Sequence, residues 1–234
     1  MSRVWAIAPS IRPQGGTLPI WKAAGYKVAV LRQGDPFPEA DITVPTETYR
    51  GWAKSINFLA RFVMNIDPEA EWLCVSNDDT LPDQNHTPEE IASQLTEHFG
   101  GTFGVMQPTG DFALWPGSNI LGFAGSPWMG RSWCERAYGG RGPIYDGFRH
   151  NWSDQELMEV AVKLGVFWQR PDLLHKHLHV GRDGGQWKWE SWQKPLNDPG
   201  LWQVEKARFE QRRRDGFPGH EPLVTESISF GALA

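Results

Sequence analysis

Cysteine is scarce in this chain, whose 234 residues include only Cys74 and Cys134. Two cysteines cannot form the disulfide framework of a small secreted domain, and Cys74 falls inside a predicted core strand. Both features favour buried free thiols in a reducing compartment. Long apolar runs are also missing, since no stretch approaches the roughly 20 residues that a transmembrane helix needs. Met1–Trp5 lacks a signal-peptide pattern, so we expect a cytoplasmic protein without a membrane span.

An excess of positive charge is absent too, because 28 acidic residues outnumber 23 lysines and arginines and the net charge is −5. This argues against a broad electrostatic footprint for nucleic acid, although it leaves room for a local basic groove. The glycine fingerprint of dinucleotide-binding domains is missing as well. The first predicted strand, Val4–Ala8, runs into Pro9–Pro13 instead of a glycine triplet before a helix. A nicotinamide-binding Rossmann domain is therefore disfavoured.

Alternating strands and helices fill residues 1–106, the first half of a domain predicted to end at residue 215. Short apolar runs predict strands at residues 4–8, 27–31, 42–44, 72–75 and 102–106. Apolar residues at helical spacing predict a helix over residues 51–65. Capping residues predict helices over residues 17–24 and 87–99, the second with a capping box formed by Thr87 and Glu90. This order predicts a single α/β, Rossmann-like domain with a mostly parallel central sheet and flanking helices.

Residues 107–215 are less regular, and they are rich in tryptophan and glycine. The chain has 13 tryptophans, whose ordinary use is core filling and whose alternative use is stacking on sugars or bases. The predicted elements are a loop at 125–130, helices at 132–137, 153–164 and 204–214, and strands at 166–168 and 173–180. The last strand alternates with period two, which places His175, His177 and His179 on one face. Residues 216–234 read as a loosely packed C-terminal tail.

Adjacent carboxylates follow the buried strand Trp72–Val75, in the sequence Asn77-Asp78-Asp79. Two neighbouring carboxylates at a strand end repel one another unless a cation or several hydrogen-bond donors neutralise them. Hard oxygen ligands of this kind suit Mg²⁺ or Mn²⁺ held jointly with a substrate diphosphate. The alternative is an Asx-rich turn with solvated carboxylates. Pro9–Arg12 and Arg32–Asp35 also follow predicted strands, so all three segments are expected on one rim of the sheet.

The order of three motifs resembles the nucleotide-sugar glycosyltransferases of type A fold, in particular the family 2-like members of phages and bacteria. The resemblance covers about residues 3 to 180. It implies that Asn77-Asp78-Asp79 matches the Asp-X-Asp motif, in which Asp79 binds the metal and Asp78 helps with ribose and metal. Residues 150–156 match a later motif whose catalytic base would be Asp154. His177 and His179 match a late histidine motif that completes the metal site.

This resemblance also frames the remaining candidates. The acidic motif starts with Asn77 instead of aspartate, and three histidines compete for the late position. The loop before residue 131 carries an aromatic side chain and could contact the acceptor or the sugar. Candidate donor-binding residues, all at predicted strand ends or at a helix start, are Pro9, Ser10, Arg12, Arg32, Asp35, Arg50, Gly51, Lys54, Asn77 and Asp78. Candidate acceptor or sugar contacts are Trp128, Met129 and Gly130.

The implied function is a metal-dependent, inverting transfer of a sugar from a nucleotide diphosphate to a hydroxyl, in a bacterial or phage-infected cytoplasm. The acceptor stays open between a hydroxymethylated pyrimidine in phage DNA and a glycan, lipid or protein hydroxyl. A nucleotidyltransferase is an alternative, although it would carry a Gly-rich signature with a lysine after its first strand. Here Gly15-Gly16 is present, but the basic residue is Arg12, which precedes the glycines. A non-catalytic nucleotide- or carbohydrate-binding module is another, and Asn77 leaves room for it.

Overall fold

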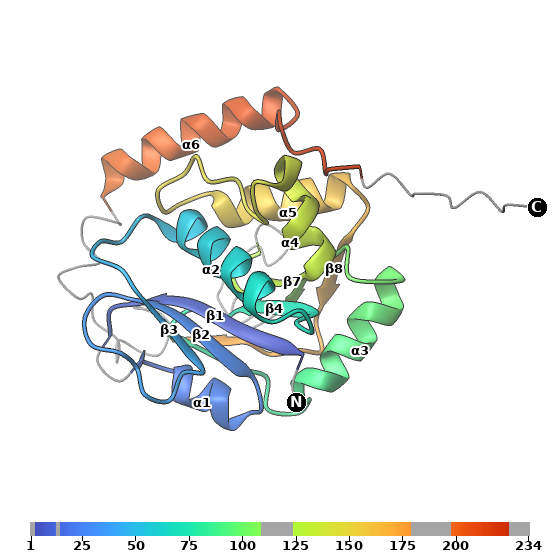
Figure 1. Ribbon diagram of the computed structural model, residues 1–234. Helices are drawn as coiled ribbons and strands as arrows, with labels where there is room; N and C mark the ends of the chain where they lie inside the picture. Colours follow the sequence, from blue (N-terminus) through green and yellow to red (C-terminus); the bar gives the residue numbers. More distant parts are fainter. Residues whose placement is uncertain (1–2, 13–14, 109–123, 179–197, 225–234) are drawn as a thin grey trace, which may run out of the picture.

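The computed structural model describes residues 3–12, 15–108, 124–178 and 198–224 (Figure 1). Its centre is a seven-stranded sheet with strand order β3-β2-β1-β4-β7-β6-β8, and β5 and β9 form a separate two-stranded sheet. The strands of the large sheet are β1 (Val4–Ser10), β2 (Lys27–Arg32), β3 (Ile42–Pro45), β4 (Trp72–Val75), β6 (Val105–Pro108), β7 (Trp128–Gly130) and β8 (Phe167–Arg170). The small sheet pairs β5 (Thr80–Leu81) with β9 (Lys176–His177).

Neighbouring strands of the large sheet are parallel except where β7 is involved. This strand runs antiparallel between β4 and β6, whereas the other four pairings are parallel. The predicted α/β class with a mostly parallel sheet and flanking helices is confirmed. Within the described ranges, no helix combines the length and apolar character needed to cross a membrane.

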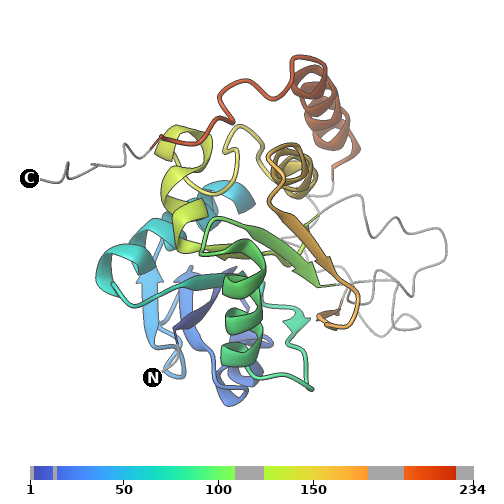
Figure 2. The ribbon, with the colours of Figure 1, turned by 90° about the vertical axis from the view of Figure 1, so that its right-hand side faces the viewer.

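Helices cover both faces of the sheet. They are α1 (Leu18–Ala23), α2 (Trp52–Ile66), α3 (Pro88–Phe99), α4 (Arg131–Gly140), α5 (Ser153–Lys163) and α6 (Pro199–Arg214). One core cluster joins the sheet to α2, α4 and α5, and a second joins its other face to α1 and α3. Helix α6 lies outermost, beyond α5 (Figures 1 and 2).

Strand β1 shows why the sheet is buried on both sides. Trp5 and Ile7 belong to one core cluster, whereas Val4, Ala6 and Ala8 belong to the other. A strand buried on both faces reads as a continuous apolar run, which is typical of parallel sheets between helix layers. The local signals for α3 also hold, because Thr87 and Glu90 form the predicted capping box.

The second half differs from the sequence prediction in several places. Residues 125–130 were predicted as a loop, but they include β7, a three-residue strand too short to show a periodic pattern. The sequence predicts Ser153 as the N-cap of α5, because a serine side chain can accept a hydrogen bond there. The N-cap is instead Trp152, with a left-handed φ of 70°. Helix α6 begins at Pro199, earlier than predicted, because Asp198 caps it by accepting a hydrogen bond from Leu201 N at 2.9 Å.

The part of the predicted tail that the structure describes, up to residue 224, is packed against the domain. Phe217 and His220 are buried. The Gly139 amide donates to the carbonyl of Glu221, and the Leu223 amide donates to that of Arg136, both at 2.9 Å. Residues 217–224 are therefore held to α4, which corrects the expectation of loose packing for this part.

The strand order places a topological switch between β1 and β4. From β1 the chain moves outward through β2 and β3, and it then crosses back to put β4 on the other side of β1. In open α/β sheets, ligands bind in the crevice beyond the carboxyl ends of the strands at such a point. Arg12 follows β1 and Asn77-Asp78-Asp79 follows β4, so both lie at this crevice.

Candidate functional site

The acidic turn after β4 packs directly against the loop after β1. Asn77 has a φ of 49°, so the chain turns sharply where the strand ends. The Thr17 amide donates to the carbonyl of Asp78 at 3.0 Å. Gly16, at a φ of 61°, allows this approach, because a Cβ at that position would lie 2.0 Å from the same carbonyl oxygen.

Asp78 is buried and anchored by two residues of the β1 end. Ser10 Oγ donates to Asp78 Oδ2 at 2.7 Å, and Arg12 Nε donates to Oδ1 at 3.1 Å. Burial and the adjacent Asp79 carboxylate raise the pKa of Asp78 to about 6, while Arg12 and Ser10 act in the opposite direction. Both Asp78 oxygens are thus engaged within the protein, which suits a residue that organises the turn.

Asp79 faces a histidine on the small sheet. Its Oδ1 lies 3.2 Å from His177 Nε2, and its Oδ2 lies 3.6 Å from Arg12 Nη2. The pairing of β5 with β9 sets Thr80 opposite His177. In addition, the Leu178 amide donates to the Asp79 carbonyl at 2.7 Å. The small sheet is therefore the device that brings a late histidine to the acidic turn.

The Asp79–His177 pair gives a carboxylate oxygen and an imidazole nitrogen side by side, a donor set that Mn²⁺ accepts. Residues 3–12, 15–108, 124–178 and 198–224 contain no group of three His, Cys, Asp or Glu side chains placed to hold a metal. His179 lies outside the described residues. The pair therefore fits an ion that takes its remaining ligands from a diphosphate and water, and it does not fit a closed protein cage.

His175 has a different environment from His177, although the sequence predicts one shared face. It is 2% exposed, its ring lies edge-on to Trp21, and its Nδ1 is 2.8 Å from Ser126 Oγ. Burial lowers the pKa of His175 to about 3, so the ring is neutral. Strand β9 covers only Lys176 and His177, and before it Leu173 and His175 are buried while Leu174 between them is exposed. His175 is thereby removed from the candidate metal ligands.

Asp154 lies in the first turn of α5 and is half-buried. Its Oδ1 accepts a hydrogen bond from Gln155 N at 3.0 Å. Burial raises the pKa of Asp154 to about 6, partly offset by backbone amides at the helix start. Its neighbour Glu156 is fully buried and accepts two hydrogen bonds of 2.7 Å from Arg212. Of the two acids here, Glu156 is thus fixed in an ion pair and Asp154 is the one suited to accept a proton.

Two bridges connect Asp154's segment to the acidic turn. Asn77 Nδ2 donates to the carbonyl of Gly125 at 3.4 Å, and the amide of the preceding Ala124 donates to the Asp154 carbonyl at 3.1 Å. The second bridge is Trp52, whose Nε1 donates to Asn77 Oδ1 at 3.0 Å and whose amide donates to the Arg149 carbonyl at 3.1 Å. The structure therefore gathers the predicted acid and base motifs around the start of α2.

Sequence reasoning missed Glu205, a buried residue of α6. Its carboxylate accepts hydrogen bonds from the backbone amides of Arg149, His150 and Asn151, the last at 2.8 Å, and from Asn151 Nδ2 at 3.1 Å. Successive amides of this kind form a nest for an anion. Glu205 thus fixes the segment that leads into Asp154. One glutamate in a polar helix carries no local signal for this contact, which joins residues 54 to 56 positions apart.

The remaining predicted donor-binding residues divide into two groups. Arg32 is buried, and its guanidinium donates to the carbonyls of Asp35 and Arg12, so it holds the loops at the ends of β1 and β2 together. Pro9 belongs to β1 and is half-buried. Three of the predicted donor-binding residues are solvent-exposed, namely Asp35, Arg50 and Lys54, whereas Gly51 is the buried N-cap of α2.

The predicted acceptor contacts are misplaced. Trp128, Met129 and Gly130 form β7 inside the sheet, and the side chains of Trp128 and Met129 have no exposed area. A buried strand cannot offer a platform to an acceptor or a sugar. These residues are buried because β7 pairs with β4 and β6, a pairing that only the tertiary structure defines.

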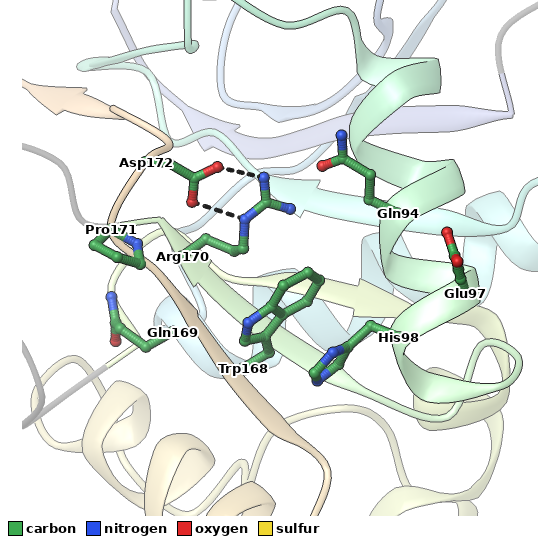
Figure 3. A pocket seen from close by; sticks show the side chains of 8 residues that line it. All are labelled: Gln94, Glu97, His98, Trp168, Gln169, Arg170, Pro171 and Asp172. Atoms are coloured by element: carbon green, nitrogen blue, oxygen red, sulfur yellow. Dashed lines mark hydrogen bonds and ion pairs between the residues drawn. The ribbon is translucent and has the colours of Figure 1, made fainter.

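A cavity of about 550 Å³ lies between α3 and β8, away from the predicted site residues (Figure 3). The ring of Trp168 in this cavity is already engaged, because it stacks on His98 at a centroid distance of 3.8 Å and carries the Arg170 guanidinium at 4.6 Å. Arg170 is in turn paired with Asp172. None of the predicted site residues lines this cavity, so we place the candidate site at the β1–β4 crevice.

No protein-family model and no curated protein matches the chain. One similar solved structure is the catalytic domain of Drosophila beta1,4galactosyltransferase 7 in complex with xylobiose. It is 16% identical over 85% of this chain and 82% of that chain, with a TM-score of 0.49. At this score we draw no functional conclusion from the similarity.

Proposed function

We propose that this protein is a metal-dependent, inverting glycosyltransferase that moves a sugar from a nucleoside diphosphate to an acceptor hydroxyl. The observation that carries the proposal is the cluster at the topological switch point. There Ser10, Arg12, Asp78, Asp79 and His177 converge beyond the carboxyl ends of β1 and β4. The cluster combines acidic, imidazole and guanidinium groups, which suits a diphosphate and a divalent cation bound together.

The donor diphosphate is proposed to bind next to Asp79. Asp79 and His177 would hold Mn²⁺ or Mg²⁺, with His179 a further candidate from the sequence. When bound, such an ion would neutralise the charge that grows on the leaving diphosphate. Arg12, whose guanidinium reaches both carboxylates, would add a fixed positive charge beside the same group.

Asp154 is proposed to act as the catalytic base. Its carboxylate would take the proton of the acceptor hydroxyl while that oxygen attacks the anomeric carbon. The bond between this carbon and the diphosphate oxygen breaks, and the nucleoside diphosphate leaves with the bonding electrons. A pKa of about 6 leaves Asp154 ionised at neutral pH and still basic enough to accept a proton. Glu205 acts through the backbone of residues 149–151 and is a positioning residue.

The first test is a thermal-shift screen of nucleotide sugars, each with and without Mn²⁺. A ligand that binds only the folded state stabilises it by mass action and so raises the melting temperature. At a ligand concentration of a hundred times the Kd, the gain in the free energy of unfolding is about 2.7 kcal/mol. We expect one class of nucleoside diphosphate donor to raise the melting temperature only with Mn²⁺. No shift with any donor would overturn the proposal. Release of pyrophosphate from a nucleoside triphosphate and a sugar phosphate would indicate a nucleotidyltransferase instead.

A further inference from the structure

A second cavity, of about 230 Å³, lies beside α2 and is strongly basic. Four cationic side chains line it, and its one acidic residue is Asp146. The cationic residues are Arg50, Lys54, Arg61 and Arg141, and all four are exposed. In the part of the chain that the structure describes, none of the four forms a salt bridge; Arg141 instead donates to the carbonyls of Tyr138 and Gly219. This local excess of positive charge contrasts with a net charge of −5 for the whole chain.

The basic side chains come from two segments: Arg50, Lys54 and Arg61 lie at the start of α2 or on it, and Arg141 caps the end of α4. Lys54, Phe58 and Arg61 are spaced four and three residues apart, so they share one side of the helix. With Arg50 just before the first turn, these residues form a stripe along α2. Its helical part, from Lys54 to Arg61, rises about 10 Å at 1.5 Å per residue. Phe58 lies within it, is 36% exposed, and stacks on Phe62 with ring centroids 6.1 Å apart. A row of cations interrupted by an exposed aromatic ring matches the charged backbone and stackable bases of a nucleic acid strand.

The stripe begins at the candidate site. Arg50 is two residues before Trp52, the residue that contacts Asn77 and the Arg149 carbonyl. Leu31 at the end of β2 and Thr46 just after β3 also line the cavity. A strand bound along α2 therefore has one end beside the segments that carry Asp79 and Asp154.

We propose that this stripe together with Arg141, a surface that we call the α2 groove, binds the phosphodiester backbone of a nucleic acid strand. A single phosphate would satisfy one or two cations, whereas four cations spread from the start of α2, along its side and to the end of α4 complement an extended polyanion. The further conclusion that the acceptor hydroxyl belongs to that strand rests on the proposed function. Binding of the strand itself does not, because it requires neither donor nor metal.

The test measures fluorescence anisotropy of a labelled single-stranded DNA 12-mer over a range of salt concentrations. Arg61→Glu should weaken binding by about tenfold at low salt, and the slope of log affinity against log salt should fall by about one. The matched control is Arg214→Glu, the same change at an exposed position on α6 outside the groove. It should change affinity by less than twofold. Phe58→Ala should weaken binding several-fold without changing the salt slope, because it removes stacking and no charge.

Two results would overturn the proposal: a wild-type protein that does not bind the 12-mer at low salt, or equal losses from Arg61→Glu and Arg214→Glu. The second result would mean that net charge, and no particular surface, decides binding. The donor thermal-shift assay is run on the same proteins. Retained DNA binding without any donor shift would remove the glycosyltransferase proposal and leave the α2 groove standing. A donor shift without DNA binding would remove the α2 groove proposal and leave the glycosyltransferase proposal standing.

Discussion

The acidic turn after β4 and the start of α5 each carry an aspartate whose pKa is raised to about 6, but the two carboxylates are held differently. Asp78 sits between Ser10 and Arg12, and repulsion from Asp79 adds to the effect of burial. Asp154 faces no such cation in the described structure, and its side chain is held by backbone at its own helix start. A carboxylate fixed by an arginine organises a site, whereas one raised by burial alone is ready to exchange a proton.

Removing the Asp154 charge should have the largest effect. Asp154→Asn keeps the shape of the side chain, so donor binding should persist, while sugar transfer should fall by about 10²- to 10⁴-fold because the base is lost. Transfer is measured with the donor identified by thermal shift. Asp172→Asn, at a carboxylate of the α3–β8 cavity, is the control and should leave transfer unchanged. A normal rate in Asp154→Asn would remove this residue from the mechanism.

The same substitution gives a second readout that separates a catalytic from a structural acid. Since burial disfavours the ionised carboxylate, Asp154→Asn should raise the free energy of unfolding at pH 7, measured by chemical denaturation. If the ionised aspartate stabilised the fold, its replacement by asparagine would instead lower the free energy of unfolding. A lower free energy of unfolding in Asp154→Asn would thus contradict the view that Asp154, unlike Asp78, is not fixed by a stabilising partner.

Asp79 tests the other region. Asp79→Asn removes the charged ligand of the proposed ion while keeping an oxygen, so the Mn²⁺-dependent donor shift should disappear, equivalent to at least about a hundredfold loss of affinity. His177→Ala should weaken the same shift by about tenfold or more. His175→Ala should leave the metal dependence unaltered, whatever it does to stability, because His175 is buried against Trp21. Unchanged Mn²⁺ dependence in Asp79→Asn would sink the metal assignment.

The pH dependence of activity and of stability tests the role of Asp154 in another way. Asp154 must be ionised to act as a base, so kcat/KM should fall about tenfold per pH unit below about 6 and level off above it. The effect on stability has the opposite direction. The folded protein binds this proton more tightly than the unfolded chain, whose value is 3.8, so the Asp154 contribution to stability decreases as pH rises from about 4 to about 6. Asp154→Asn should remove this component, as measured by denaturation at pH 4, 5, 6 and 7.

The smallest effect is expected at Glu205. Glu205→Gln would place an amide NH₂ among the backbone donors of residues 149–151 and should lower stability by about 1–3 kcal/mol. That corresponds to a decrease in Tm of about 2–4 °C per kcal/mol for a domain of this size. Glu210→Gln, at an exposed position of the same helix, should change Tm little.

Kinetics then distinguish the positioning role from a merely structural one. If Glu205 positions the segment before Asp154, kcat should fall several-fold in Glu205→Gln at a temperature where the variant is fully folded, while the KM for the donor stays constant. An unaltered kcat would leave Glu205 with a structural role alone.

Local patterns carried much of the prediction. Apart from the two-residue strand β5, which was not predicted, the order of strands and helices up to β6 follows from apolar periodicity and capping, both of which act within a few residues. The Asn77–Asp79 turn was found for the same reason, since it directly follows a buried apolar strand. Strand β7 was missed because three residues carry no period, and it is defined by hydrogen bonds to β4 and β6. Trp128 was assigned to an acceptor loop on that mistaken basis.

The sequence by itself determined the α/β class, the rim on which the acidic turn lies, and the chemical types available there. Each of these depends on short stretches of chain whose side-chain pattern dictates local structure. Only the tertiary structure decided that His177 meets Asp79 while His175 is buried, that Glu205 anchors the segment before Asp154, and that cations from two distant segments share the α2 groove. Those pairings join residues far apart in the chain, so they depend on how sheets and helices pack and leave no trace in any local pattern.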